Sequence, residues 1–290
     1  MPKGSGLIDL HMHSTVSDGT DSPEELVQAV RRAGISVFSV TDHDAVKAGQ
    51  IIRTILADDP GMTFIPGVEF SCEDEEGKYH ILGYGFDPDG ESVNSVIEES
   101  HAIRMRKLDA RLSFLREEFG FSFPDKEIEA LRRLDNPGKP HIGNLMVRYG
   151  YAADRNEAIG KYMNDPRLEN EHIRPQTAIA AVLKDGGVPV LAHPFFGSGD
   201  ELILGEDMEK RLKKLMDYGV RGIEAFYSGF TDKLRDAALR LAAEYGLYVT
   251  AGSDYHGGNK IVGLAQNGLD EYGEYPEGMR RFLGRFGVEL

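Results

Sequence analysis

Short apolar runs alternate with helix-like segments through most of the chain, and this alternation restricts the possible folds most strongly. Residues 7–10 read as a buried strand. The pattern over 23–33 predicts a helix, with Ser22 as its N-cap and Gly34 as its end. Another apolar run, residues 35–40, follows. Strands that are joined by helices run parallel and are covered on both faces, so the sequence predicts an α/β protein.

The same alternation returns after residue 176, with apolar runs at 188–194, 220–228 and 247–257. Six or seven such units imply a mainly parallel sheet, and a closed TIM-like barrel is the economical arrangement for 290 residues. An open doubly wound sheet is the alternative. Its dinucleotide-binding version is disfavoured because no G-x-G-x-x-G follows the first strand.

The strand pattern is replaced by charged helical patterns between residues 92 and 176. We interpret this region as a mostly helical insertion that caps the substrate. The barrel itself is then expected to consist of residues 1–91 and 177–290.

The composition excludes several classes of protein. A net charge of -15 opposes nonspecific attraction to duplex nucleic acid or anionic membranes. No apolar run is long enough for a membrane span, and the first residues lack the apolar region of a secretory signal. The single Cys72 excludes an intrachain disulfide. We therefore expect a cytoplasmic protein, in which a phosphate ligand would need a local positive site such as metal ions.

Side chains that can bind metal ions gather where the apolar runs end. Strand ends meet at one face of a parallel barrel, so these side chains are expected to converge. His11 and His13 lie two positions apart on a strand and therefore point to the same face. Histidines mixed with carboxylates suit Zn, Mn or Fe, and such a large set suits two or three divalent ions. The predicted ligands are His11, His13, Asp18, His43, Glu69, His80, His193, Asp254 and His256.

Seven motifs, HMHS, SDG, TDHD, GVEFSC, YHILGYG, AHP and GSDYHG, resemble in this order those of the PHP (polymerase and histidinol phosphatase) family. The resemblance implies a distorted (β/α)7 barrel with a trinuclear metal site. It also implies a distribution of the ligands: His11, His13, Glu69 and Asp254 for one ion, Asp18, His43 and His256 for a second, and His80, His193 and the bridging Glu69 for a third.

The insertion, with GKPHIG at 138–143, is similar to the family branch that acts on nucleoside 3',5'-bisphosphates and short 5'-phosphorylated RNA. That branch more often has arginine where Lys139 stands. Cationic side chains over a pocket bind phosphate through charge-assisted hydrogen bonds. The candidates for substrate contact are Arg104, Arg106, Lys139 and His141, and Tyr227 is expected either to stack on a base or to pack as a core aromatic.

Two further carboxylates, Asp42 and Asp44, flank His43. They are candidates for orienting that histidine or for handling the proton of the leaving group, although Asp44 alternatively caps the next helix. His193 is counted both as a ligand and as a catalytic residue. Cys72 is expected to point away from Glu69 into the core rather than to act as a nucleophile.

These features predict a metal-dependent phosphoesterase in which a hydroxide bridging two ions attacks phosphorus. The expected substrates are phosphomonoesters of nucleotides, through 3',5'-bisphosphate nucleotidase or 5'-3' exoribonuclease activity on short RNA. Three alternatives stay open: a histidinol-phosphate-type phosphatase, a metal-dependent amide hydrolase, whose barrel also opens with H-x-H, and a noncatalytic metal-loaded scaffold. No obligate protein partner is implied.

Overall fold

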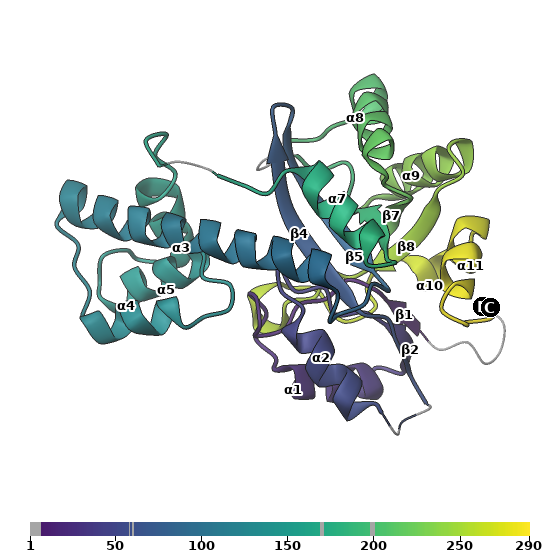
Figure 1. The fold of residues 1–290 in the computed structure, drawn as a ribbon, viewed down its shortest axis with the longest axis horizontal. Helices are drawn as coiled ribbons and strands as arrows, with labels where there is room; N and C mark the ends of the chain where they lie inside the picture. Colours follow the sequence, from purple (N-terminus) through teal and green to yellow (C-terminus); the bar gives the residue numbers. More distant parts are fainter. Residues whose placement is uncertain (1–6, 58, 60, 169–170, 198–200) are drawn as a thin grey trace. The chain divides into compact units, whose positions relative to one another are not determined.

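The computed structural model describes residues 7–57, 59, 61–168, 171–197 and 201–290. The chain divides into two compact units. Unit 1 comprises Met1–Val96 and Ile173–Leu290, and unit 2 comprises Ile97–His172 (Figure 1). Unit 2 begins at Ile97, inside the long helix α3 (Glu91–Phe119). The sequence predicts an insertion that begins at residue 92, near the start of the same helix.

A small parallel sheet forms the N-terminal part of unit 1. Its strands are β1 (Leu7–Asp9), β2 (Ile35–Phe38) and β3 (Thr63–Phe64). The helices α1 (Pro23–Arg32) and α2 (Lys47–Ile55) connect them. Ser22 and Glu25 form a reciprocal capping box at the start of α1, which fixes where this helix begins. The buried face of α1 then packs Leu26, Val27 and Val30 into the core.

The second sheet of unit 1 has five strands in the order β4-β5-β6-β7-β8. They are β4 (Gly67–Asp74), β5 (Gly77–Tyr84), β6 (Val188–Leu191), β7 (Gly222–Tyr227) and β8 (Tyr248–Gly252). The helices α7 (Pro175–Lys184), α8 (Gly205–Tyr218), α9 (Asp232–Glu244), α10 (Leu269–Tyr272) and α11 (Glu277–Gly284) belong to the same unit. Of these, α7 packs on β4 to β6, α9 on β7 and α11 on β8 (Figure 1).

The mixed α/β fold with parallel strands is confirmed, but the expected closed barrel is not observed. The strands form separate sheets of three and five, and β5 runs antiparallel to both β4 and β6. A two-residue turn joins β4 to β5, which forces these strands to run in opposite directions. In the described part of the chain, isolated residue pairs link the two sheets, Met12 with Tyr255 and His43 with Glu69.

Both main-chain and side-chain hydrogen bonds join the two sheets where they approach each other. The carboxylate of Asp9, in β1, accepts hydrogen bonds from the backbone N–H groups of Ser253 and Ala265 at 2.9 and 2.7 Å. Asp42 likewise accepts the N–H of Ser14 at 2.8 Å. A backbone N–H group that is bonded to a carboxylate is no longer available to a neighbouring strand. The carboxylates of Asp9 and Asp42 therefore interrupt the regular hydrogen bonding at these two places.

Unit 2 is helical among its described residues. It contains most of α3 together with α4 (Asp125–Arg132), α5 (Lys139–Arg148), α6 (Arg155–Glu157) and the π-helical turn η1 (Ala158–Tyr162). Leu108 and Leu115 of α3 share a buried cluster with Ile142 and Met146 of α5. Among the residues described in either unit, no helix is both long enough and apolar enough to cross a membrane.

We expect Gly252→Ala to destabilise unit 1. A Cβ atom at Gly252 would lie 2.1 Å from the Cβ of His11 and 2.5 Å from Oε1 of Glu224. Overpacking of this kind costs about 1–3 kcal/mol, and each kcal/mol lowers the melting temperature by roughly 2–4 °C. Thermal unfolding measures the effect. Gly284→Ala is the matched control, because a Cβ there would meet nothing within 4 Å, and a control that melts as early as Gly252→Ala would contradict the packing argument.

Candidate metal centre

The ends of the strands in unit 1 bring the candidate ligands into one buried cluster. His11 and His13 follow β1 and alternate with Leu10 and Met12, which are fully buried on the other face of the chain. Main-chain hydrogen bonds hold this segment between neighbours on both sides, for example from Asp254 to His11 at 2.7 Å. The remaining candidate ligands come from β4, from β5 and from the segments after β1, β2, β6 and β8, namely Asp18, His43, Glu69, His80, His193, Asp254 and His256.

Glu69 lies at the centre of the cluster, and only 1% of it is exposed. Its Oε1 atom is 2.8 Å from Nδ1 of His80 and 3.3 Å from Nε2 of His193. Its Oε2 atom is 3.2 Å from a ring nitrogen of each of three other histidines, His11, His13 and His43. One carboxylate therefore faces two separate groups of imidazoles.

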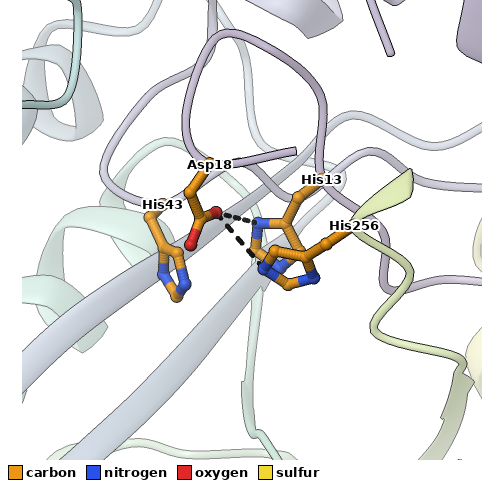
Figure 2. A group of neighbouring side chains, drawn as sticks. All are labelled: His13, Asp18, His43 and His256. Atoms are coloured by element: carbon orange, nitrogen blue, oxygen red, sulfur yellow. Dashed lines mark ion pairs between the residues drawn. The ribbon is translucent and has the colours of Figure 1, made fainter. Parts of the chain in front are cut away.

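A second carboxylate, that of Asp18, lies beside Nδ1 of His13 (Figure 2), whereas Glu69 faces Nε2 of the same ring. Its Oδ1 atom is 3.2 Å from Nε2 of His256 and 3.7 Å from Nδ1 of His13. His43 completes this group, in which one ligand atom from each residue lies within 4.8 Å of the others. Two more groups meet the same criterion: His11 with His13 and Glu69, and His43 with Glu69 and His80.

The free ligand atoms show that the cluster fits divalent ions. Nε2 of His11, Nε2 of His13 and Oε2 of Glu69 are buried, yet within the described residues they make no hydrogen bond. Buried polar atoms are rarely left without partners, because losing their contact with water costs free energy. Here the three residues bring ligand atoms within 4.8 Å of one another, and these are the nitrogen and oxygen donors that Zn, Mn and Fe prefer. Divalent ions would satisfy all three atoms.

The negative charge of the buried carboxylates raises the pKa values of two histidines in the cluster. Burial acts to lower the pKa of His11, but Glu69, Glu224 and Asp254 outweigh it and hold that pKa well above its usual value. The pKa of His13 is raised to about 9 against the effect of burial, through Asp254 and Glu69. Protons on His11 and His13 thus balance part of the carboxylate charge, and cations would take the place of those protons.

The main chain is strained at the cluster. Asp44, His193 and Asp254 have φ angles of +49°, +25° and +57°, in the left-handed region that non-glycine residues seldom adopt. In the described part of the chain, one other non-glycine residue, Ala265, has a positive φ. Strain of this kind persists only where surrounding contacts hold it, and it is concentrated at functional sites.

Glu224 supports the cluster and was not identified from the sequence. It is fully buried in β7. Its Oε1 lies 3.0 Å from Nδ1 of His11, and its Oε2 accepts the backbone N–H of His193 at 2.8 Å. A carboxylate on Nδ1 fixes the tautomer of a histidine and directs Nε2 toward a metal. The available signal was an acidic residue inside the apolar run "GIEAFY".

The predicted catalytic carboxylates make well-defined contacts. Both oxygens of Asp42 accept hydrogen bonds from Ser14, and one of them also accepts the Ser17 hydroxyl at 2.7 Å. Burial raises the pKa of Asp42. Asp44 accepts the backbone N–H of Ser71, and α2 has Val46 as its N-cap, so the alternative capping role of Asp44 is wrong. Cys72 is buried, and burial holds its thiol pKa well above the usual value.

The predicted substrate contacts fall in both units. Tyr227, at the end of β7, donates its hydroxyl to Oδ2 of Asp254 at 2.9 Å and is therefore part of the cluster's edge. The other candidates belong to unit 2, where Arg106 pairs with Glu171, and Lys139 donates to Asn164 at 2.6 Å. The roles of Arg104, Arg106, Lys139 and His141 in substrate binding stay predictions.

Comparisons with known proteins agree with this site. The sequence profile of the PHP domain matches residues 9–136. A phosphoribosyl 1,2-cyclic phosphate 1,2-diphosphodiesterase from Eggerthella lenta is 31% identical over 262 residues, covering 87% of this chain and 94% of the relative. A Bifidobacterium adolescentis structure assigned as a metal-dependent phosphoesterase superposes with a TM-score of 0.79 at 27% identity, covering 98% of this chain and 97% of that one.

Two further relatives carry other activities. A Haemophilus influenzae 5'-3' exoribonuclease is 28% identical, covering 86% of this chain and 89% of the relative. A 3',5'-nucleoside bisphosphate phosphatase from Chromobacterium violaceum is 29% identical, covering 90% and 92%. The chain therefore belongs to the PHP family and is a metal-dependent phosphoesterase.

We expect the metal-free protein to lose stability as the pH rises from 6.5 to 9. The pKa of His13 is about 9 when folded and near 6.5 when unfolded, so its contribution is complete below pH 6.5 and is lost as pH approaches 9. The melting temperature of chelator-treated protein should fall over this range by roughly 2 °C or more. Added Mn²⁺ should stabilise more at pH 8.5 than at pH 6.5. A metal-induced shift that is larger at the lower pH would contradict the idea that ions replace protons.

We expect Glu224→Gln to weaken metal binding. Losing the carboxylate removes the partner that fixes Nδ1 of His11, and changes of this kind cost about 10–100-fold in metal affinity. Competition with a fluorescent chelator measures the affinity. Glu244→Gln, at the end of α9, is the control and should bind metal as the wild type does. Equal affinities for wild type and Glu224→Gln would show that His11 is oriented by other contacts.

Proposed function

We propose that the protein hydrolyses phosphomonoesters of nucleotides, as a 3',5'-bisphosphate nucleotidase, as a 5'-3' exoribonuclease on short RNA, or as both. The observation that carries this proposal is the central position of Glu69, whose two oxygens face two groups of histidines. A bridging carboxylate of this kind is suited to hold neighbouring ions over one phosphoryl group. We assign the nine clustered side chains as ligands of three ions, with Mn, Fe or Zn as candidates.

Divalent ions at this site would make water more acidic and would stabilise the charge on the phosphoryl oxygens. The chain's own residues supply the rest. Glu224 directs Nε2 of His11 into the cluster. Asp42 accepts hydrogen bonds from Ser14 and Ser17 and so holds the turn that precedes Asp18. The burial of His11, His13 and Glu69 excludes bulk water from the cluster's interior, which strengthens electrostatic interactions there.

The nucleotide substrate class is supported by the activities of the relatives from Haemophilus influenzae and Chromobacterium violaceum. We assign Arg104, Arg106, Lys139 and His141 to contacts with a second phosphate, because cationic groups bind phosphate through charge-assisted hydrogen bonds. His193 and the Asp42–Asp44 segment are assigned to the reaction itself. The Eggerthella lenta relative supports a second candidate, hydrolysis of a cyclic sugar phosphate diester.

We expect Mn²⁺-loaded protein to release inorganic phosphate from adenosine 3',5'-bisphosphate and to lose this activity with a chelator. Glu69→Gln should reduce kcat/KM by about 10²-fold or more, since it removes the bridging negative charge. Glu75→Gln is the matched control, because Glu75 is an exposed residue of the turn after β4, and it should retain activity.

A comparison of kcat/KM ranks the alternatives. The panel contains the bisphosphate, a 5'-phosphorylated trinucleotide, histidinol phosphate, a ribose 1,2-cyclic phosphate ester, and simple amides and lactones. Preference for the bisphosphate or the trinucleotide supports the proposal. A higher kcat/KM for histidinol phosphate, the cyclic ester, an amide or a lactone would contradict the proposal and assign hydrolysis of that substrate instead.

A further inference from the structure

Lys260 lies at the edge of the candidate metal centre, where the cluster meets solvent. Its Nζ atom is 2.5 Å from Oδ2 of Asp254. The side chain of Lys260 is 41% exposed, whereas that of Asp254 is 7% exposed. The ammonium group therefore lies at one border between the buried ligands and solvent.

The loop that carries Lys260 is held against the segment that carries Asp18. Gly258 donates its N–H to Oγ1 of Thr20 at 2.8 Å, and the side-chain amide of Asn259 donates to the carbonyl of Asp18 at 2.8 Å. The loop also passes so close to Thr20 that a Cβ atom on Gly257 would lie 2.0 Å from its hydroxyl oxygen. These contacts hold the main chain beside Lys260, and the ion pair with Asp254 holds its ammonium group at the edge of the cluster.

The hydrogen bonds around Asp254 leave Lys260 able to bind something else. Oδ2 of Asp254 also accepts the hydroxyl of Tyr227 at 2.9 Å, and Oδ1 faces Nε2 of His13 at 3.3 Å. Asp254 is thus held from several sides. An ammonium group has more than one N–H donor, and the exposure of Lys260 leaves donors directed to solvent.

We propose that Lys260 contacts the ester oxygen of the substrate and stabilises the charge that develops there. This inference rests on the proposed phosphomonoesterase function. The phosphoryl group would be held at the buried ligands, while the organic part of the substrate extends to solvent. The ester oxygen, which joins these two parts, would then lie at the border where Lys260 stands.

The reaction balances without a change in the protonation of Lys260. An oxygen from water forms a bond to phosphorus, and the bond from phosphorus to the ester oxygen breaks, with its electron pair staying on the ester oxygen. The proton lost by the water is returned through solvent to give the alcohol. Lys260 remains cationic throughout and acts by hydrogen bonding to the departing oxygen.

The dependence of the rate on the leaving group tests the proposal. Substrates are adenosine 3',5'-bisphosphate and glycerol 2-phosphate, which release poorly stabilised alkoxides, and p-nitrophenyl phosphate, which releases a stable phenolate. Lys260→Met should lower kcat by about 10²–10³-fold on the two alkyl esters and by less than about 10-fold on the aryl ester. Lys260→Arg should recover part of the loss, because it restores a cationic donor.

Metal content by elemental analysis and activity of Lys233→Met, an exposed lysine of α9, are the controls. Equal losses on alkyl and aryl esters, or loss of metal from Lys260→Met, would overturn the inference while leaving the proposed function intact. A wild-type enzyme that cleaves glycerol 2-phosphate and the aryl ester but not the nucleotide would overturn the nucleotide assignment alone. The comparison of the two remaining esters would still decide the role of Lys260.

Discussion

The buried carboxylate of Glu69 sets the conditions for the rest of unit 1. It is almost completely removed from water and faces five imidazole rings. A buried negative charge is costly unless positive charge lies beside it. Burial acts to raise the pKa of Glu69, yet His43, His11 and His80 hold it well below its usual value. Cations would supply the same compensation without protons, so metal binding and the stability of unit 1 are coupled.

Buried carboxylates around this centre interrupt the main-chain hydrogen bonding where the two sheets meet. Asp9, Asp42 and Glu224 each accept a backbone N–H group near a strand end. These bonds orient the chain at Ser253, Ser14 and His193, and they use backbone donors that would otherwise be available to a strand ladder. At these strand ends, some backbone N–H groups bond to the buried carboxylates and others bond to neighbouring strands.

Some residues of the metal centre could be predicted from the sequence, and others could not. His11 and His13 could be found because alternation along a strand puts both on one face, and the buried Leu10 and Met12 that alternate with them confirm the period. Glu224 and Lys260 could not, since a single acid in a strand or a lysine in a glycine loop has many ordinary roles. The closed barrel is not observed, and the apolar runs also do not reveal that a two-residue turn makes β5 antiparallel to its neighbours.

The distribution of charge favours small substrates over long ones. The whole chain carries a net charge of -15, so a long polyanion meets repulsion over most of its length. Ions at the cluster and the ammonium of Lys260 would attract phosphate groups only in their immediate surroundings. Charges separated by more than about 10 Å are largely screened at ordinary salt concentration, so this attraction acts on one or two phosphates. A mononucleotide or the end of a short RNA matches that range, whereas a duplex would present many more phosphates to an acidic surface.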